Sequence, residues 1–155
     1  QKQGYKNRGY EGVTVVGDFN NYDQFYDWLI QQAGYGEKDD KGHSFQLDKD
    51  LLGDGLTYSK EHCILLPREI NNATIKPKTS KGRPTGVYKT TNRFTCRISK
   101  YNVERTIGCY NSVEEAYDAY KETKVVYLKE LAEKWKDKID QRAYSALINY
   151  GNNLK

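Results

Sequence analysis

Residues 86–120 restrict the fold of this chain more than any other stretch. Three runs rich in β-branched and aromatic residues, GVYKT, NRFTCRISK and ERTIGCY, are separated by turn-forming pairs. These pairs are Thr91-Asn92 and Tyr101-Asn102. In the middle run one set of alternate positions is apolar: Phe94, Cys96 and Ile98. The other set is polar or cationic: Arg93, Thr95, Arg97 and Ser99. Because alternate residues of a strand point to opposite faces, the pattern predicts a three-stranded antiparallel sheet with one apolar side.

A helix is expected directly after these strands. Ser112 opens the sequence S-V-E-E, a capping box in which Glu115 takes the third helical position. The apolar residues of this helix recur at helical spacing: Val113, Ala116, Tyr120, Tyr127 and Leu131. We expect them to cover the apolar side of the sheet and to leave the side with Arg93 and Arg97 open. A C-terminal helix is expected from Asp140 to Gly151, with the glycine as a left-handed C-cap.

The positive charge of the chain is concentrated in one segment. The net charge is +4, but residues 1–72 carry 8 Lys/Arg against 12 Asp/Glu, and residues 111–155 carry 8 of each. Between them, residues 73–110 carry 9 Lys/Arg and a single acid, Glu104. This concentration of cations predicts a surface that binds a polyanion, and a basic loop without a partner is the alternative.

Composition also limits the class of protein. No apolar run approaches the roughly 20 residues that cross a bilayer, and no signal-peptide pattern is present, so we expect a cytoplasmic protein without a membrane partner. Cys63, Cys96 and Cys109 form no CxxC pair and are odd in number, which predicts reduced thiols and no zinc site. Because the sequence has no methionine, even at position 1, we expect a processed or trimmed N-terminus.

The first half of the chain predicts a second set of elements. A short strand is expected within residues 12–19, followed by a helix over residues 22–32 that Asn20 or Asn21 would cap. Further on, residues 45–52 predict a strand that ends at a Gly-Asp-Gly turn. A second short extended piece then leads into a helix whose first turn holds Pro67, where a missing N–H costs nothing.

The segment 73–85 divides the chain. It holds two of the three prolines, four cations and no acid, which is typical of a linker. We therefore expect an α+β protein in three parts: a small core in residues 1–72, the basic linker, and a sheet-and-helix module with a C-terminal helix in residues 86–155.

With these residues in view, the second module resembles the plant APETALA/ethylene-response-factor DNA-binding domain. The likeness lies in GV at 86–87, the strand RFTCRIS, the turn IG-x-Y at 107–110 and the helix start S-x-EEA-x-x-AY at 112–120. The resemblance implies a sheet that enters the major groove of duplex DNA, where arginine can grip guanine with two hydrogen bonds. Tyr88 and Thr90 stand near positions where that family has arginine, and its tryptophans are absent, so base specificity is not carried over.

From residue 10 on, the chain more closely resembles the phage-borne HNH homing endonucleases, which combine a nuclease core with such a domain. The likeness runs in the family's order through YEGVTV, FYDWL, QLDKDLL, LPREIN and KDKIDQRAYSALINY. It implies a small ββα-metal core ahead of the sheet, and a protein that acts on duplex DNA in the cytoplasm of a bacterial host.

The resemblance also implies the chemistry of that core. Asp48 on the strand and Asn71 on the helix would hold one Mg²⁺ or Mn²⁺ through oxygen atoms, with no small-molecule cofactor. Lys49 stands where ordinary HNH enzymes have their base histidine; with an ordinary pKa of about 10.4 it clamps a phosphate but takes no proton. His62 is another candidate base, and His43 precedes the strand. Purely structural roles are the alternative: a turn carboxylate, a helix cap, a strand-edge charge and a packing histidine.

The residues predicted to contact DNA come from the linker and the sheet: Lys81, Arg83, Lys89, Arg93, Thr95, Arg97, Lys100 and Arg105. If six of these cations each neutralise a phosphate, the binding constant should fall with salt with a log–log slope of roughly −5. Two other functions stay open. One is a regulator that binds DNA without cutting it. The other is a phage factor that binds a host protein or RNA through N-terminal tyrosines: Tyr5, Tyr10, Tyr22 and Tyr26.

Overall fold

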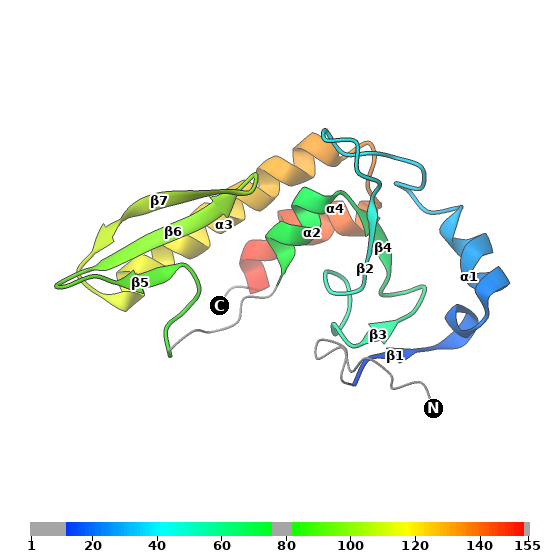
Figure 1. The fold of residues 1–155 in the computed structure, drawn as a ribbon, viewed down its shortest axis with the longest axis horizontal. Helices are drawn as coiled ribbons and strands as arrows, with labels where there is room; N and C mark the ends of the chain where they lie inside the picture. The colour runs from blue at the N-terminus through cyan, green and yellow to red at the C-terminus, as the bar shows by residue number, and fades with distance from the viewer. Residues whose placement is uncertain (1–11, 76–81, 154–155) are drawn as a thin grey trace, which may run out of the picture.

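The computed structural model describes residues 12–75 and 82–153. Over these residues the chain is a mixed α/β protein, with four α-helices beside two two-stranded sheets and one three-stranded sheet (Figure 1). The expected mixture of helices and small sheets is confirmed at this level. Lys81, Tyr5 and Tyr10, named above as candidate contact residues, lie outside the described residues.

The predicted three-stranded antiparallel sheet is confirmed. Its strands are β5 (Val87–Lys89), β6 (Phe94–Lys100) and β7 (Val103–Tyr110), with β6 in the middle. The β6–β7 hairpin turns at Tyr101 and Asn102, whose φ angles are 53° and 62°. Left-handed backbone at both central residues is what a two-residue type I′ turn requires. This turn therefore joins the two longest strands in antiparallel register.

The long helix α3 (Val113–Trp135) begins at the predicted cap. Ser112 Oγ accepts the backbone N–H of Glu115 at 3.1 Å. The Glu115 carboxylate returns to the backbone N–H of Asn111, also at 3.1 Å, one residue earlier than a capping box places it. The start of α3 then packs on the sheet in one small core that contains Val87, Cys96 and Ala116.

The second half of α3 packs elsewhere, so the expectation that its whole apolar face covers the sheet is wrong. Tyr127 and Leu131 belong to the main core, together with buried residues of the first half of the chain: Phe45, Ile64, Leu65, Leu66, Ile70 and Ala73. A helix of 23 residues is about 35 Å long, which exceeds what a sheet of three short strands covers. Its far end therefore buries its apolar face against a second partner.

That second partner is a strand pair followed by a helix: β2 (Gln46–Asp48), β4 (Ile64–Leu66) and α2 (Arg68–Thr74), with β2 and β4 antiparallel. The strand expected over residues 45–52 is shorter because Asp48 accepts two backbone N–H groups and turns the chain. The extended piece after the glycine turn, β3 (Thr57–Tyr58), pairs instead with β1 (Thr14–Val15), in parallel. Pro67 is the N-cap of α2 rather than a first-turn residue.

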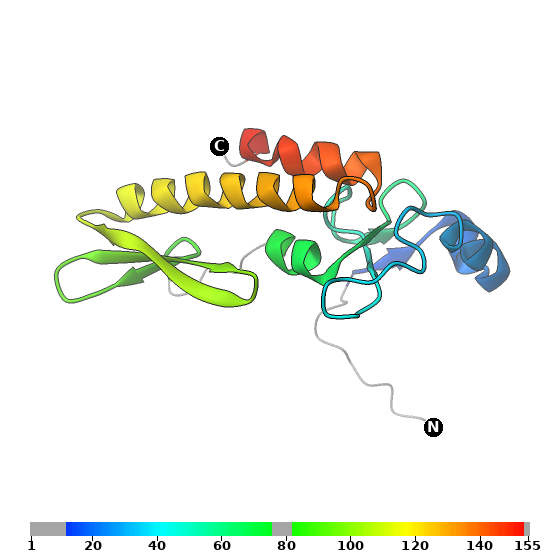
Figure 2. The same ribbon diagram turned by 90° about the horizontal axis from the view of Figure 1, so that it is seen from above.

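The remaining elements are η1 (Gly17–Asn20), α1 (Tyr22–Leu29), α4 (Gln141–Ile148) and η2 (Tyr150–Asn153). Asn21 caps α1 as expected, and Asp140, where the last helix was expected to begin, is the N-cap of α4. Gly151 is not a left-handed C-cap, because α4 ends three residues earlier and Gly151 lies within η2. A Cβ at this position would lie 3.1 Å from a methyl group of Val125, so the missing side chain lets η2 approach α3 closely. Figure 2 shows α3 between the three-stranded sheet and α4.

Candidate functional site

The sheet has one side covered by α3 and one side that no described helix covers (Figure 2). We call the second side the open face. Cross-strand partners share a face, so the register of the strands assigns each side chain to one side. Arg97 pairs with Thr106, and Tyr88 pairs with Thr95, all on the open face. Ile98, which is 4% exposed, points toward α3.

Arg97 lies on the open face by its register, and Arg93, just ahead of β6, continues the same alternation; both are partly accessible and already oriented. Arg93 is exposed, and its Nε and Nη2 donate to Asn111 Oδ1 at 3.3 Å. Arg97 Nη1 donates to Glu104 Oε2 at 3.2 Å, and its guanidinium lies 5.1 Å from the centre of the Tyr88 ring. The open face therefore presents two positioned guanidinium groups beside one carboxylate.

Thr95 lies between these arginines on β6 but is enclosed. It is only 7% exposed, and its hydroxyl is 3.5 Å from Cys109 Sγ. The structure thus places Thr95 on the predicted face as a packing residue, without a surface large enough for a base edge.

Three other predicted cations lie on the opposite side of the sheet. Lys89 pairs with Phe94, and Arg105 pairs with Ile98, so both project on the side of α3, where they are exposed at the sheet edges. Lys100 donates to Glu130 of α3 at 3.2 Å and lies over the Tyr127 ring. The structure therefore does not bring all the cations of residues 86–110 together on one surface. Arg83 is half-buried ahead of β5.

The β2–β4–α2 unit places the two predicted metal ligands on one side of β2. Asn71 Nδ2 donates to Gln46 Oε1 at 2.9 Å, so α2 lies over the side of β2 that bears Gln46. Asp48 is two positions further along the strand and shares that side. Its Oδ1 accepts the N–H groups of Asp50 and Leu51 at 3.2 and 2.9 Å. Burial raises the pKa of this carboxyl, which is 3% exposed.

Lys49 is a firmly protonated side chain in this unit. Its ammonium pairs with Asp50 Oδ1 at 2.9 Å and lies 5.5 Å from the Tyr58 ring centre. Burial works against the charged form, but the hydrogen bond and the charge of Asp50 outweigh it and raise the pKa of Lys49. Lys49 is therefore suited to hold an anion and unsuited to accept a proton.

His62, the other predicted catalytic residue, packs against the glycine turn. Its ring lies so close to Gly53 that a Cβ there would be 2.8 Å from His62 Cγ. Nδ1 is buried and has no hydrogen-bond partner among the described residues. The ring of His43, the other histidine, pairs with Asp39 at 3.1 Å.

Sequence reasoning missed two residues that shape this region. Gln46 holds Asn71, and Arg142 of α4 donates to the carbonyl of Glu61 at 3.0 Å, which braces the turn beside His62. The next residue, Cys63, is a buried thiol whose pKa is raised to about 11 by burial. It is too weakly acidic to serve as a nucleophile at neutral pH. All three cysteines are free thiols.

The oxygen atoms of Asp48 and Asn71 beside β2 are of the type that Mg²⁺ prefers. A carboxylate and an amide oxygen are hard ligands, and Mg²⁺ commonly uses one or two protein ligands with water and substrate phosphate completing the rest. Within residues 12–75 and 82–153, no cluster of three or more His, Cys, Asp or Glu side chains is arranged to hold a metal. Asp48 and Asn71 are thus the residues that would carry such an ion.

Comparison with known proteins gives no relative: no family model, no curated protein and no solved structure matches the chain. Among the helices of the described residues, none combines the length and apolar character needed to cross a membrane.

Proposed function

We propose that the protein binds duplex DNA through the open face of its sheet and cuts it with a metal ion beside β2, as the resemblance to HNH homing endonucleases implies. The observation that carries the proposal is the register of Arg97 with Thr106, on the side of the sheet that α3 leaves uncovered, and the exposed Arg93 just ahead of β6 supports it. A small β-ribbon fits the major groove of B-DNA, and arginine recognises guanine and phosphate with paired hydrogen bonds.

The partners of these arginines favour binding. Asn111 offers Arg93 a neutral amide oxygen, and Tyr88 supports the guanidinium of Arg97 by stacking. Side chains held in place before binding lose less conformational entropy when DNA arrives. A DNA phosphate or guanine edge would then replace the weak contacts to Asn111 and Glu104.

The strand pair and helix would supply the chemistry. When bound, Mg²⁺ would stabilise the leaving oxygen and polarise the phosphate. Asp48 must be ionised to hold the ion, and its burial disfavours that form, so metal binding should weaken as the pH falls. Lys49, which is charged, would hold a substrate phosphate. His62 is the residue of this unit that would accept the proton of the attacking water.

A second candidate function is supported by the state of Lys49. A protonated, ion-paired lysine in the position of the base favours a protein that kept the fold and binds DNA without cutting it. Such a regulator would use the same open face.

Supercoiled plasmid, with Mg²⁺ or Mn²⁺, separates these functions. Endonuclease activity predicts nicking that Asp48→Asn abolishes. Asp54→Asn is the matched control, because Asp54 also accepts two backbone N–H groups in the neighbouring turn. Duplex binding in EDTA without nicking by either metal would support the regulator. Absence of duplex binding in a gel shift would remove both functions.

A further inference from the structure

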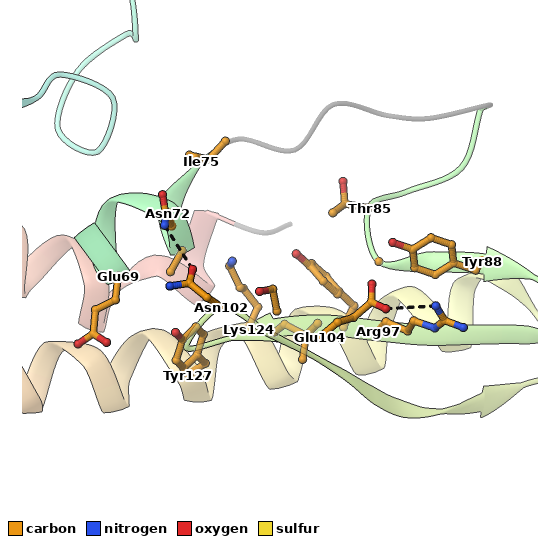
Figure 3. Close-up of a pocket in the computed structure, with 15 residues that line it drawn as sticks. Glu69, Asn72, Ile75, Thr85, Tyr88, Arg97, Asn102, Glu104, Lys124 and Tyr127 are labelled. Carbon is orange, nitrogen blue, oxygen red and sulfur yellow. Dashed lines mark hydrogen bonds and ion pairs between the residues drawn. The ribbon is translucent and has the colours of Figure 1, made fainter. Parts of the chain in front are cut away.

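A cavity of about 330 Å³ lies between the end of α2, strand β6 and the middle of α3 (Figure 3). It is separate from the side of β2 that bears Asp48. Its volume is at the lower end of the range for small-molecule sites, about 300–1,000 Å³. Seven of the residues that line it carry the argument: Glu69, Asn72, Arg97, Asn102, Glu104, Tyr120 and Lys124.

Lys124 is an unpaired cation in this cavity. It projects from α3 between Asn102 and Glu104 (Figure 3), and burial lowers its pKa. On the same helix Lys121 pairs with Asp118 at 2.9 Å and Lys134 pairs with Glu69 at 2.6 Å, whereas Lys129 is exposed to solvent. No carboxylate of the described residues lies within ion-pair distance of Lys124. The ammonium of this half-buried lysine is therefore available to an anionic ligand.

Two other side chains of the cavity wall carry hydrogen-bond donors. Arg97 Nε is buried and has no acceptor among the described residues, while Nη1 of the same side chain holds Glu104. Asn102 Oδ1 accepts from Asn72 Nδ2 at 3.4 Å, which leaves the N–H₂ group of Asn102 to donate. Because Arg97 Nε has almost no accessible surface, the donors of the described wall that a ligand can reach are the Lys124 ammonium and the Asn102 N–H₂ group.

The carboxylates of the wall are already engaged. Glu104 accepts from Arg97, and Glu69 accepts from Lys134 and from the Trp135 indole. Neither leaves Lys124 with a counter-charge. Tyr120 also lines the cavity, and burial raises its pKa to about 12, so its hydroxyl is neutral.

We propose that this cavity binds a phosphate group, held by the Lys124 ammonium and the Asn102 N–H₂ group. An ammonium from α3 and an amide donor from the β6–β7 turn suit a tetrahedral anion, which accepts hydrogen bonds in several directions. The volume leaves room for a group attached to the phosphate. The phosphate belongs either to a free phosphorylated small molecule or to a DNA backbone, because Arg97 borders both the cavity and the open face. The assignment does not depend on the proposed DNA cleavage.

Titration of the whole chain with inorganic phosphate and with 2′-deoxyadenosine 5′-phosphate, followed by amide NMR shifts, tests this assignment. The expected result is saturable shifts centred on Asn102 and Lys124, with about tenfold or greater loss of affinity in Lys124→Gln, since a hydrogen bond to a charged group is lost. Lys129→Gln is the control, because Lys129 is an exposed lysine of the same helix. No saturable shift in the wild-type protein, or equal losses in both variants, would overturn the proposal.

A competition arm identifies the source of the phosphate. If the cavity takes a DNA phosphate, duplex DNA displaces the nucleotide, and Lys124→Gln weakens duplex binding. If it takes a free ligand, nucleotide binding is kept while duplex binding is equal in Lys124→Gln and Lys129→Gln. Either result supports the phosphate site, and a protein that binds nucleotide but no DNA would refute only the proposed function.

Discussion

Replacing Glu104 with glutamine tests whether the open face binds DNA. Glu104 is the single acidic residue of the segment 73–110, and its carboxylate lies 3.2 Å from Arg97 Nη1. The substitution keeps the size of the side chain, removes the negative charge that a phosphate would meet, and releases the guanidinium. We therefore expect Glu104→Gln to bind duplex DNA more tightly than the wild-type protein.

The expected gain follows from the exposure of the pair. The side chains of Arg97 and Glu104 are 42% and 57% exposed, so solvent screens their attraction. Breaking such a pair costs at most about 1 kcal/mol of folding stability. A phosphate about 6 Å from the carboxylate would be repelled by about 0.7–1.4 kcal/mol at effective dielectric constants of roughly 80 to 40. Removing that repulsion corresponds to a decrease in Kd of about three- to tenfold.

Fluorescence anisotropy with a labelled duplex in EDTA at low salt measures this change. Glu130→Gln is a closely matched control, since Glu130 also pairs with a cation, Lys100, at 3.2 Å, but on the side of α3. The same increase in net charge should there leave DNA binding nearly unchanged. Equal gains in the two variants would show a general charge effect, and unchanged or weaker binding in Glu104→Gln would refute the assignment of the open face.

Three further changes test the fold and the metal centre. Leu131→Ala should cost about 2–5 kcal/mol of unfolding free energy in urea titrations, because Leu131 is fully buried in the main core; a cost well below this would contradict that core. Gly86→Ala should cost about 1 kcal/mol or more, because φ is +77° and the added Cβ would lie 2.3 Å from Tyr120; a thermal melt equal to wild type would disprove it. Burial raises the pKa of Asp48, so the fold favours its protonated form more than the unfolded chain does: this contribution to stability is complete below the unfolded pKa of about 4 and is lost as pH rises through the folded pKa. Asp48→Asn should thus be at least as stable as wild type at pH 7, with a smaller advantage below pH 4. Urea midpoints of both proteins at the two pH values measure this, and a lower midpoint for the variant at pH 7 would contradict it.

Sequence reasoning succeeded where the signal is local. The cap at Ser112 and the turn at Tyr101 and Asn102 depend on neighbouring residues only, and both are present in the structure. The alternation of β6 likewise placed Cys96 and Ile98 on the buried side. Such features need no knowledge of distant parts of the chain.

Features set by distant contacts could not be predicted in this way. The pairing of β2 with β4 rather than with β3 depends on which strand reaches the main core. Lys100 shares the parity of Ile98, so its side could have been inferred, but the side of Arg105 depends on an irregularity in register near Cys96 and Arg97. For the metal centre, the sequence named Asp48 and Asn71 but gave no sign that Gln46 holds the amide in place.

The continuous helix α3 has a consequence for spacing. Its first half is anchored in the small core and its second half in the main core, so α3 fixes the distance between the three-stranded sheet and the β2–β4 pair. Each helical turn added to α3 would increase that distance by about 5.4 Å, and one base-pair step of DNA rises about 3.4 Å. If the protein cuts DNA, the length of α3 would therefore set the distance between the recognised base pairs and the phosphodiester bond that is cut.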